Sequence, residues 1–245
     1  MEDFKKAREL FRDVVKTDLY VPLPSQEKVK IDLISIIKQR DKIVLLTGEA
    51  GSGKSMILKK IYEELKDEEV IFFVSNPYSE INSILSLLKK VKPTHHQTFL
   101  IDEAQLLSAE TWENLRIYAD RGNVTLLFAT HDTNVDELLK KKHFRSRINY
   151  IIPTSSISFE ETQNFVLTKL NRAGLSDVAK MFTKSNFRKV YKFAKGSLRG
   201  TNQLMFKLFD VLDYFYTKSP AKVNLRKLSN KYIEIAIMDL KEFNA

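Results

Sequence analysis

GEAGSGKS, residues 48–55, is the stretch that decides the fold of this 245-residue chain. It fits the pattern GxxxxGK[S/T], in which glycines let backbone N–H groups converge on a phosphate in conformations that a side chain would obstruct. An apolar run, KIVLLT at 42–47, precedes the loop, and a helical pattern follows it at 55–66. A buried strand, a glycine-rich loop and a helix in this order predict a phosphate site at a helix N-terminus.

Each position of the loop has an expected part in holding ATP and Mg²⁺. We expect Lys54 to reach the β- and γ-phosphates and the Ser55 hydroxyl to bind Mg²⁺. The other expected nucleotide contacts come from the loop and the first helical turn, at Gly48, Glu49, Ala50, Gly51, Ser52, Gly53 and Met56. The loop by itself predicts that a nucleoside triphosphate is held.

An Asp-Glu pair follows a later buried strand, Thr98–Ile101. Its position puts Asp102 at the carboxyl edge of the sheet, where ligands bind in such folds, and we expect Asp102 to hold Mg²⁺ through water. Glu103 can polarise the water that attacks the γ-phosphate. On a solvated turn such a pair would have no role, but after a buried strand and beside a phosphate loop it indicates hydrolysis.

A polar residue is also expected near the γ-phosphate at the end of a neighbouring strand. Thr130 follows the apolar run 124–129 and is the first candidate, with His131 as the alternative. A strand-end cap would be the structural interpretation of either residue. The other histidines, His95, His96 and His143, are interpreted as surface residues.

The order of elements predicts an α/β protein with two domains. Apolar strands alternate with helices, which requires right-handed crossovers and a parallel sheet covered by helices on both faces. After residue 158 the pattern becomes helical throughout. We expect a nucleotide-binding core with an N-terminal helical segment at 1–155 and a small all-α domain at 156–245. The expected strands are 42–47, 70–74, 98–101, 124–129 and 150–152, and the expected helices 3–16, 26–40, 55–66, 80–91, 108–120, 160–173, 176–184, 186–194, 199–217 and 224–243.

Composition narrows the class of protein. The chain has no cysteine, which excludes a disulfide framework and a thiolate metal site. No apolar stretch is long enough for a membrane span, so we expect a cytoplasmic protein. The net charge of +9 is concentrated in residues 156–245, where 16 Lys and Arg face 8 Asp and Glu. This excess indicates either solvated helix faces or a surface for a polyanion or acidic partner.

Several motifs together resemble those of the AAA+ ATPases, and more narrowly of the ExeA/GspA group. This group includes MshM and is similar to the transposition ATPases TniB and TnsC. Apart from the phosphate loop, the resemblance rests on LPSQEKV at 23–29, Asn76-Pro77, IDEAQLLS at 101–108, LRIYAD at 115–120, SRI at 146–148, KLNRAG at 169–174, MFT at 181–183 and GSLRGTNQL at 196–204.

The resemblance implies roles for two arginines that would otherwise be read as surface cations. Arg147, with Arg145 as the alternative, matches the finger that reaches the ATP of a neighbouring subunit and contributes about 10³–10⁵ in rate. Arg199 matches the lid arginine that contacts the γ-phosphate of its own subunit. The segment 20–24 corresponds to the one that lies over the adenine. The group often has Gly-Gln where this chain has Thr130-His131, so both remain candidates for the sensor at this strand end.

Three functions remain open, and the first two, which the resemblance implies, are roles of an ATPase that forms homo-oligomers. The first is an assembly or motor factor for a secretion, type IV pilus-like or DNA-uptake system. The second is a DNA-binding ATPase that forms rings or filaments on duplex DNA. The basic residues 156–245 favour the second, whereas the lack of a DNA-reading module after them favours the first. A non-catalytic nucleotide switch is the third, and the intact Glu103 speaks against it. ExeA also carries a membrane span and a peptidoglycan-binding part that this sequence lacks, so envelope anchoring is not implied.

Overall fold

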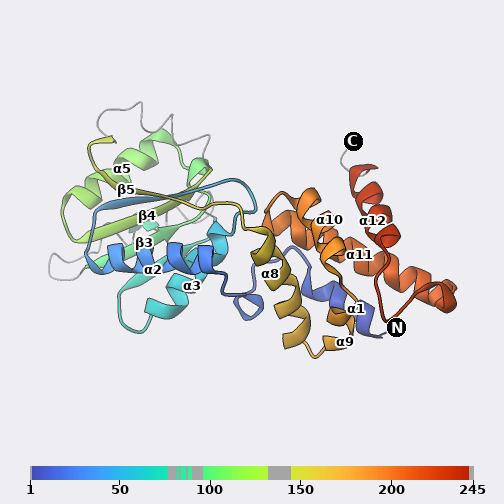
Figure 1. Ribbon diagram of the computed structural model, residues 1–245. Helices are drawn as coiled ribbons and strands as arrows, with labels where there is room; N and C mark the ends of the chain where they lie inside the picture. Colours follow the sequence, from blue (N-terminus) through green and yellow to red (C-terminus); the bar gives the residue numbers. More distant parts are fainter. Residues whose placement is uncertain are drawn as a thin grey trace. The chain divides into compact units, whose positions relative to one another are not determined.

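The computed structural model describes residues 2–76, 82, 84–86, 88–89, 96–131 and 145–242, and in this part of the chain the apolar runs form one parallel sheet. The strand order is β2-β3-β4-β1-β5 (Figure 1). Six of the twelve residues of the expected helix at 80–91 are described and are helical, whereas the other six lie outside the described residues, as do Pro77, His95 and His143. The strands are β1 (Ile43–Thr47), β2 (Ile71–Val74), β3 (Gln97–Ile101), β4 (Val124–Thr130) and β5 (Ile148–Pro153).

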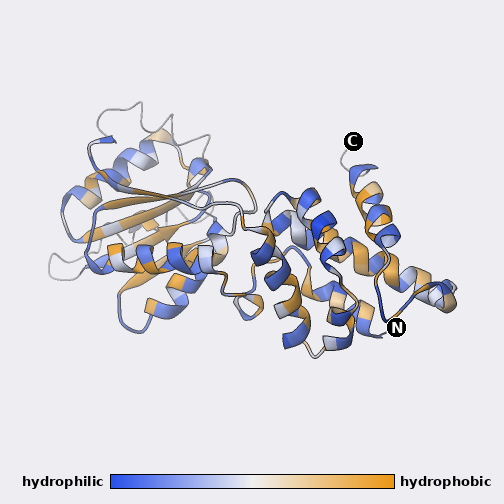
Figure 2. Cartoon of the chain, viewed as in Figure 1, coloured by the Kyte–Doolittle hydropathy of each residue, from blue (hydrophilic) through white to orange (hydrophobic). Residues whose placement is uncertain are grey.

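Alternate residues of the central strands pack into two separate cores, one on each face of the sheet. Ile43 and Leu45 of β1 pack with residues of α5 (Ala109–Asp120). Val44 and Leu46 of the same strand pack with α2 (Pro24–Lys38) and α3 (Lys54–Leu65). Figures 1 and 2 show these helices on the two sides of a largely hydrophobic sheet. Burial on both faces explains why the strands read as continuous apolar runs, and the prediction of a sheet covered on both sides is confirmed.

The parallel register brings the carboxyl ends of the strands to one edge. Thr47, the last residue of β1, pairs with Thr130 on one side and with Pro153 on the other. Asp102 follows directly after β3, whose last residue pairs with Phe128. Because β1 lies between β4 and β5, the direction of the strand order reverses there, and such a point forms the ligand crevice of open α/β sheets.

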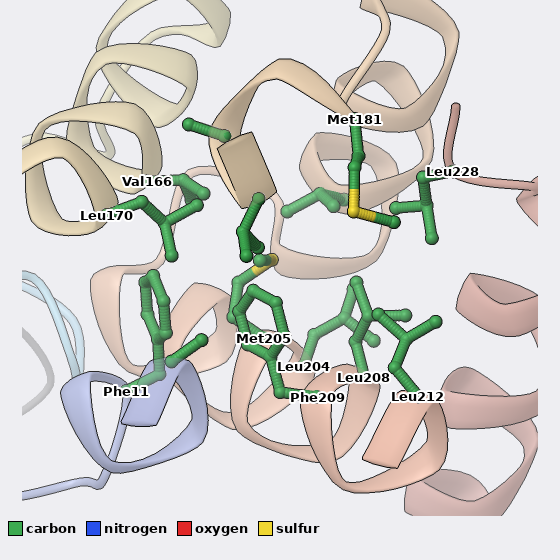
Figure 3. Close-up of a cluster of buried hydrophobic side chains, with 14 of the residues drawn as sticks. Phe11, Val166, Leu170, Met181, Leu204, Met205, Leu208, Phe209, Leu212 and Leu228 are labelled. Carbon is green, nitrogen blue, oxygen red and sulfur yellow. The ribbon is translucent and has the colours of Figure 1, made fainter. Parts of the chain in front are cut away.

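A second unit is entirely helical among its described residues. It comprises residues 1–23 and 156–245, and the sheet unit comprises 24–155. Ser158 and Thr183 form capping boxes that begin two of the helices. Figure 3 shows the core, in which Phe11, Met205 and Phe209 meet residues of other helices. The helices are α1 (Glu2–Leu10), α8 (Phe159–Arg172), α9 (Ser176–Lys180), α10 (Lys184–Ala194), α11 (Leu198–Lys218) and α12 (Asn230–Glu242), with short 3₁₀ turns η1 (Thr17–Leu19) and η3 (Pro220–Lys222).

The N-terminal segment belongs to the helical unit, whereas the sequence assigned it to the core. The Phe4 and Phe11 rings lie 6.5 and 5.8 Å from the Phe209 ring, and Arg8 Nη1 lies 3.0 Å from Asp210 Oδ1. The spacing of apolar residues predicted a helix here but did not specify which of the two units its apolar face would pack against. The second division between the two units falls between Ser155 and Ser156.

Three helices are shorter than their sequence patterns suggested, among them α9, which ends at Lys180 rather than at residue 184. The first helix ends at Leu10 rather than at residue 16, and Val14 and Val15 beyond it are 40% and 41% exposed. With no core to cover them, these β-branched residues favour extended backbone. The last helix begins at Asn230 rather than at 224, because the Leu228 amide donates to Met181 O and its side chain is buried. No helix among the described residues is long and apolar enough to cross a membrane.

Candidate active site

The phosphate loop connects β1 to α3 and is shaped by glycines in left-handed conformations. Gly51 has φ +80° and Gly53, directly before α3, has φ +99°. At Gly48 an added Cβ would lie 1.9 Å from Thr154 Oγ1 and 3.1 Å from the backbone oxygen of that residue. The loop is therefore closed against the segment after β5, and glycine is required at 48 by space as well as by backbone conformation.

Thr154 is a site residue that sequence reasoning missed. Its amide and its hydroxyl both donate to Thr47 O, at 2.7 and 2.9 Å, and its hydroxyl lies 2.7 Å from Ser52 Oγ. These bonds fix the loop to the end of β1. The available signal was a polar residue directly after a strand, the same signal that identified Asp102 and Thr130.

Lys54 is buried along the inner side of the loop. Its ammonium group donates to Gly48 O at 2.7 Å and to Glu49 O at 3.0 Å, and its residue is 7% exposed. The N–H groups of the first turn of α3 have no partner within the helix and direct the positive end of its dipole to the same place. An ammonium group, converging amides and a helix N-terminus fit a triphosphate, so the residues present fit the predicted ligand.

Ser55 and Asp102 come together from α3 and from the end of β3. The Ser55 hydroxyl donates a hydrogen bond to the Asp102 carboxylate, and the Glu103 amide donates to Asp102 Oδ1 at 3.0 Å. Burial raises the pKa of Asp102 above its ordinary value, and these two hydrogen bonds oppose that rise. A neighbouring divalent cation would stabilise the carboxylate in the same way.

The donor set at this point suits Mg²⁺. A hydroxyl and a carboxylate are hard oxygen ligands, and Mg²⁺ characteristically uses one or two of them together with phosphate oxygens and water. The part of the chain that the structure describes contains no group of three or more His, Cys, Asp or Glu residues that could hold a metal by itself. Ser55 and Asp102 would thus hold the ion that neutralises phosphate charge when a nucleotide is bound.

Glu103 is held at the edge of the site by two side chains. Its backbone is left-handed, at φ +49°. The Gln105 amide donates to Glu103 Oε2, and His131 Nε2 lies 3.7 Å from the same oxygen. His131, expected as the alternative to Thr130, thus faces Glu103, and Gln105 is a neighbour that the sequence did not suggest.

Thr130 ends β4, the strand between β3 and β1. It is 1% exposed, and among the described residues its hydroxyl has no hydrogen-bond partner. An unpaired buried hydroxyl costs about 1–3 kcal/mol. Such a group at the ligand edge of the sheet fits one whose partner is the bound ligand or its water.

Arg147 lies at the opposite end of the sheet from the phosphate loop. It directly precedes β5, whose first residue Ile148 pairs with Ile43 at the start of β1. Its Nε lies 2.9 Å from Asp120 Oδ2 at the end of α5. The length of the strand, roughly 16 Å between Ile148 and Pro153, separates Arg147 from the phosphate loop of its own chain. Arg145, the alternative, is exposed at the same end.

Arg199 lies in the first turn of α11 in the helical unit, after the N-cap Ser197. Its Nε lies 3.3 Å from Asp13 Oδ2, and both side chains are about half exposed. In the segment 20–24, Val21 and Leu23 are buried in the helical core, and Tyr20 O accepts a hydrogen bond of 2.6 Å from Arg172. The assigned roles of Arg199 and of this segment at the nucleotide stay predictions.

Several solved structures share the fold of this chain. The Aeropyrum pernix ORC1 protein, solved in complex with DNA, has a TM-score of 0.68 and 12% identity over 95% of this chain and 69% of its own. The Thermotoga maritima RuvB Holliday junction branch migration motor has a TM-score of 0.60 and 18% identity over 94% and 73%. Domain III of the T. maritima replication initiation protein DnaA has a TM-score of 0.59 and 15% identity over 92% and 96%. At these identities the likeness is one of fold, and it confirms the predicted AAA+ P-loop architecture.

Sequence comparison gives the family. No curated protein matches the chain significantly, and the narrower resemblance to the ExeA/GspA group stays a prediction. Residues 3–143 match the family model described as novel STAND NTPase 5. This match includes the phosphate loop, Asp102, Glu103 and Thr130, and it covers more than half of the 245 residues. The chain therefore belongs to the novel STAND NTPase 5 family.

Proposed function

We propose that this chain binds Mg-ATP and hydrolyses it to ADP and phosphate. The observation that carries the proposal is the meeting of Lys54, Ser55 and Asp102 at the carboxyl edge of the sheet, with Glu103 directly beside them. In this arrangement Lys54 neutralises phosphate charge, while Ser55 and Asp102 hold Mg²⁺. A structural cluster would not need an ammonium group and a hydroxyl from α3 and a carboxylate from the end of β3 at one ligand edge.

Glu103 is proposed as the base that orients the attacking water. Its side chain is 41% exposed, so its carboxylate can exchange the Gln105 amide for a water molecule. Thr130 would accept or donate a hydrogen bond at the γ-phosphate or at that water, which fits its unpaired hydroxyl. These two residues would act on the transferred phosphate from adjacent strands β3 and β4.

We further propose that the active site is completed by a neighbouring subunit in an ATP-dependent homo-oligomer. Arg147, directly before β5, is too far from the phosphate loop of its own chain to reach it, but its side chain is 34% exposed at the other end of the sheet. A head-to-tail arrangement would place one subunit's Arg147 at the next subunit's phosphates. Its pair with Asp120 is near the surface and therefore costs little to break.

Duplex DNA is the second candidate for what the ATPase acts on, and the observation that favours it is the charge of residues 156–245. This segment carries twice as many basic as acidic residues, and clustered cations release counterions when they neutralise phosphates. The role in a secretion, pilus-like or DNA-uptake system rests on the resemblance of the sequence alone.

Phosphate release by the wild type, Lys54→Ala and Glu103→Gln tests the proposal. We expect Glu103→Gln to retain the affinity for a fluorescent ATP analogue while its hydrolysis rate falls by about 10²–10⁴. Lys54→Ala should lose binding as well as hydrolysis. Glu110→Gln, an exposed change on α5, is the matched control and should behave as the wild type. Hydrolysis by Glu103→Gln at the wild-type rate would remove Glu103 from the mechanism.

A further inference from the structure

One segment of the helical unit contains only basic charges. Residues 178–209 include eight Lys and Arg and no Asp or Glu. Helix α10 lies within this segment; its Phe187 and Val190 are buried in the helical core, and its Ala194 is also buried. Because one face of α10 is fixed against the core, the orientation of its other face is fixed as well.

Three basic residues follow one another along the outer face of this helix, and a fourth is its C-cap residue. They occupy positions i, i+4, i+8 and i+11, all are exposed, and the line they form is about 16 Å long. We call this set the α10 basic stripe, and it consists of Lys184, Arg188, Lys192 and Lys195. Figure 2 shows blue, hydrophilic residues on the ribbon of α10.

The α10 basic stripe has no internal counter-charge. Within the described residues, none of its four side chains forms an ion pair. Lys189, which lies between them in sequence, points toward α12 and pairs with Glu234 at 2.6 Å. Four uncompensated cations along one helix and its C-cap repel one another, so an external polyanion would stabilise them.

Two further cations lie in the segment next to the beginning of the stripe. Arg226 and Lys227 are exposed, and the Leu228 amide after them donates to Met181 O at 2.8 Å. Asn230 Nδ2 donates to Ser185 Oγ at 3.1 Å, beside Lys184. The hydrogen bonds therefore place a second basic segment beside the N-terminal end of α10.

We propose that the α10 basic stripe binds the phosphate backbone of duplex DNA. A 16 Å length of duplex carries about ten phosphates, enough to pair with every cation of the stripe. An acidic protein is a weaker fit, because protein interfaces centre on apolar or aromatic side chains and none of the exposed large hydrophobic residues described lies on α10. This inference rests on the proposal above that the ATPase acts on duplex DNA, and it names the surface that would bind the DNA. Contacts of these cations to backbone phosphates carry no direct sequence information, so we expect the binding to be independent of base sequence.

The binding of a 30-base-pair duplex at 50–200 mM salt tests the stripe by fluorescence anisotropy, with a slowly hydrolysed ATP analogue present. We expect K184Q/R188Q/K192Q/K195Q to bind at least tenfold more weakly, and the slope of log affinity against log salt to decrease in size by about 3 to 4. The control K5Q/K6Q/K218Q/K222Q removes the same charge from exposed lysines elsewhere in the helical unit. It should keep the wild-type slope. Circular dichroism would verify that both variants are folded.

Several results would overturn the inference. One is an equal loss of DNA binding in the control, which would show that only total charge matters. A second is equal binding of poly-glutamate by the wild type, which would indicate an acidic protein partner. A third is the absence of DNA binding by the wild type. Binding of a fluorescent ATP analogue is measured in the same samples, so that failure of the stripe is distinguished from failure of the ATPase proposal.

Discussion

Thr125 and Thr130 are both buried on strand β4, but their hydroxyl groups have different surroundings. Thr125 Oγ1 donates to Asp41 O at 2.7 Å and lies 2.9 Å from His96 Nε2. Thr130 Oγ1 has no partner among the described residues. The first hydroxyl therefore contributes to the stability of the unliganded protein, whereas the second is available to a ligand.

Substitution of each threonine by valine should separate these roles, because valine keeps the shape and removes the hydroxyl. We expect Thr130→Val to leave the free energy of unfolding unchanged or to raise it by about 1 kcal/mol, while ATP hydrolysis falls at least tenfold. Thr125→Val should lose about 1 kcal/mol of stability and keep its hydrolysis rate. Urea unfolding and phosphate release measure both quantities. Loss of stability without loss of rate in Thr130→Val would make this residue a strand-end cap.

The residues of the site that sequence reasoning identified are those whose role follows from local context. Lys54 and Ser55 belong to one continuous loop, and Asp102 follows a recognisable buried strand. Thr154 and Gln105 could not be assigned in this way, because their contacts depend on which strands are neighbours and on the left-handed turn at Glu103.

At the level of elements, Lys169 joins three helical segments through a buried ammonium group. It lies on α8 and donates to Leu10 O and to Asn202 Oδ1, both at 3.1 Å. Its ammonium nitrogen lies 4.5 Å from the centre of the Phe165 ring and 5.2 Å from that of Phe11. Burial lowers the pKa of Lys169 from 10.5 to about 8.

This lowered pKa predicts a stability that rises with pH. Below about pH 8 Lys169 is protonated in both the folded and the unfolded chain. Between about pH 8 and 10.5 the unfolded chain binds the additional proton, so the free energy of unfolding increases with pH over this window. From pH 7.5 to 9.5 the wild type should gain about 2 kcal/mol relative to Lys169→Met. Urea unfolding at several pH values measures the difference between the two proteins.

Lys180→Met is the matched control for this experiment, since Lys180 is an exposed lysine of the same unit. At each pH, the free energy of unfolding of each variant is subtracted from that of the wild type. This difference removes the contribution of titrating groups that all three proteins share. A constant difference between the wild type and Lys169→Met across the range would mean that the ammonium group is solvated in the folded protein.

The elements themselves were predictable to different degrees for a physical reason. Strands β1 and β4 are buried on both faces, so their apolar runs mark them without ambiguity. The end of α1 and the start of α12 depend instead on which side chains find a core, as the exposed Val14 and the buried Leu228 show. In both cases the helical sequence pattern extends beyond the end of the observed helix, but the packing of side chains against a core stops there.

At the scale of the whole molecule, the separation of Arg147 from its own phosphate loop leads to a prediction about assembly. If Arg147 acts on the neighbouring subunit, Arg147→Ala has an intact nucleotide site but offers no finger. Lys54→Ala offers an intact finger but has no nucleotide site. Each variant alone should be inactive. A mixture should restore hydrolysis at those interfaces where an intact nucleotide site of one subunit meets an intact Arg147 of its neighbour.

Phosphate release from equimolar mixtures measures this complementation. We expect about a quarter of the wild-type rate for Arg147→Ala mixed with Lys54→Ala, because half of the sites and half of the fingers are intact and they combine at random across head-to-tail interfaces. A mixture of Lys54→Ala with Glu103→Gln should stay inactive, since both changes damage the same site. Arg145→Ala alone distinguishes the two candidate fingers. Full activity of Arg147→Ala by itself would contradict a finger at this position, and an inactive first mixture would contradict action between subunits.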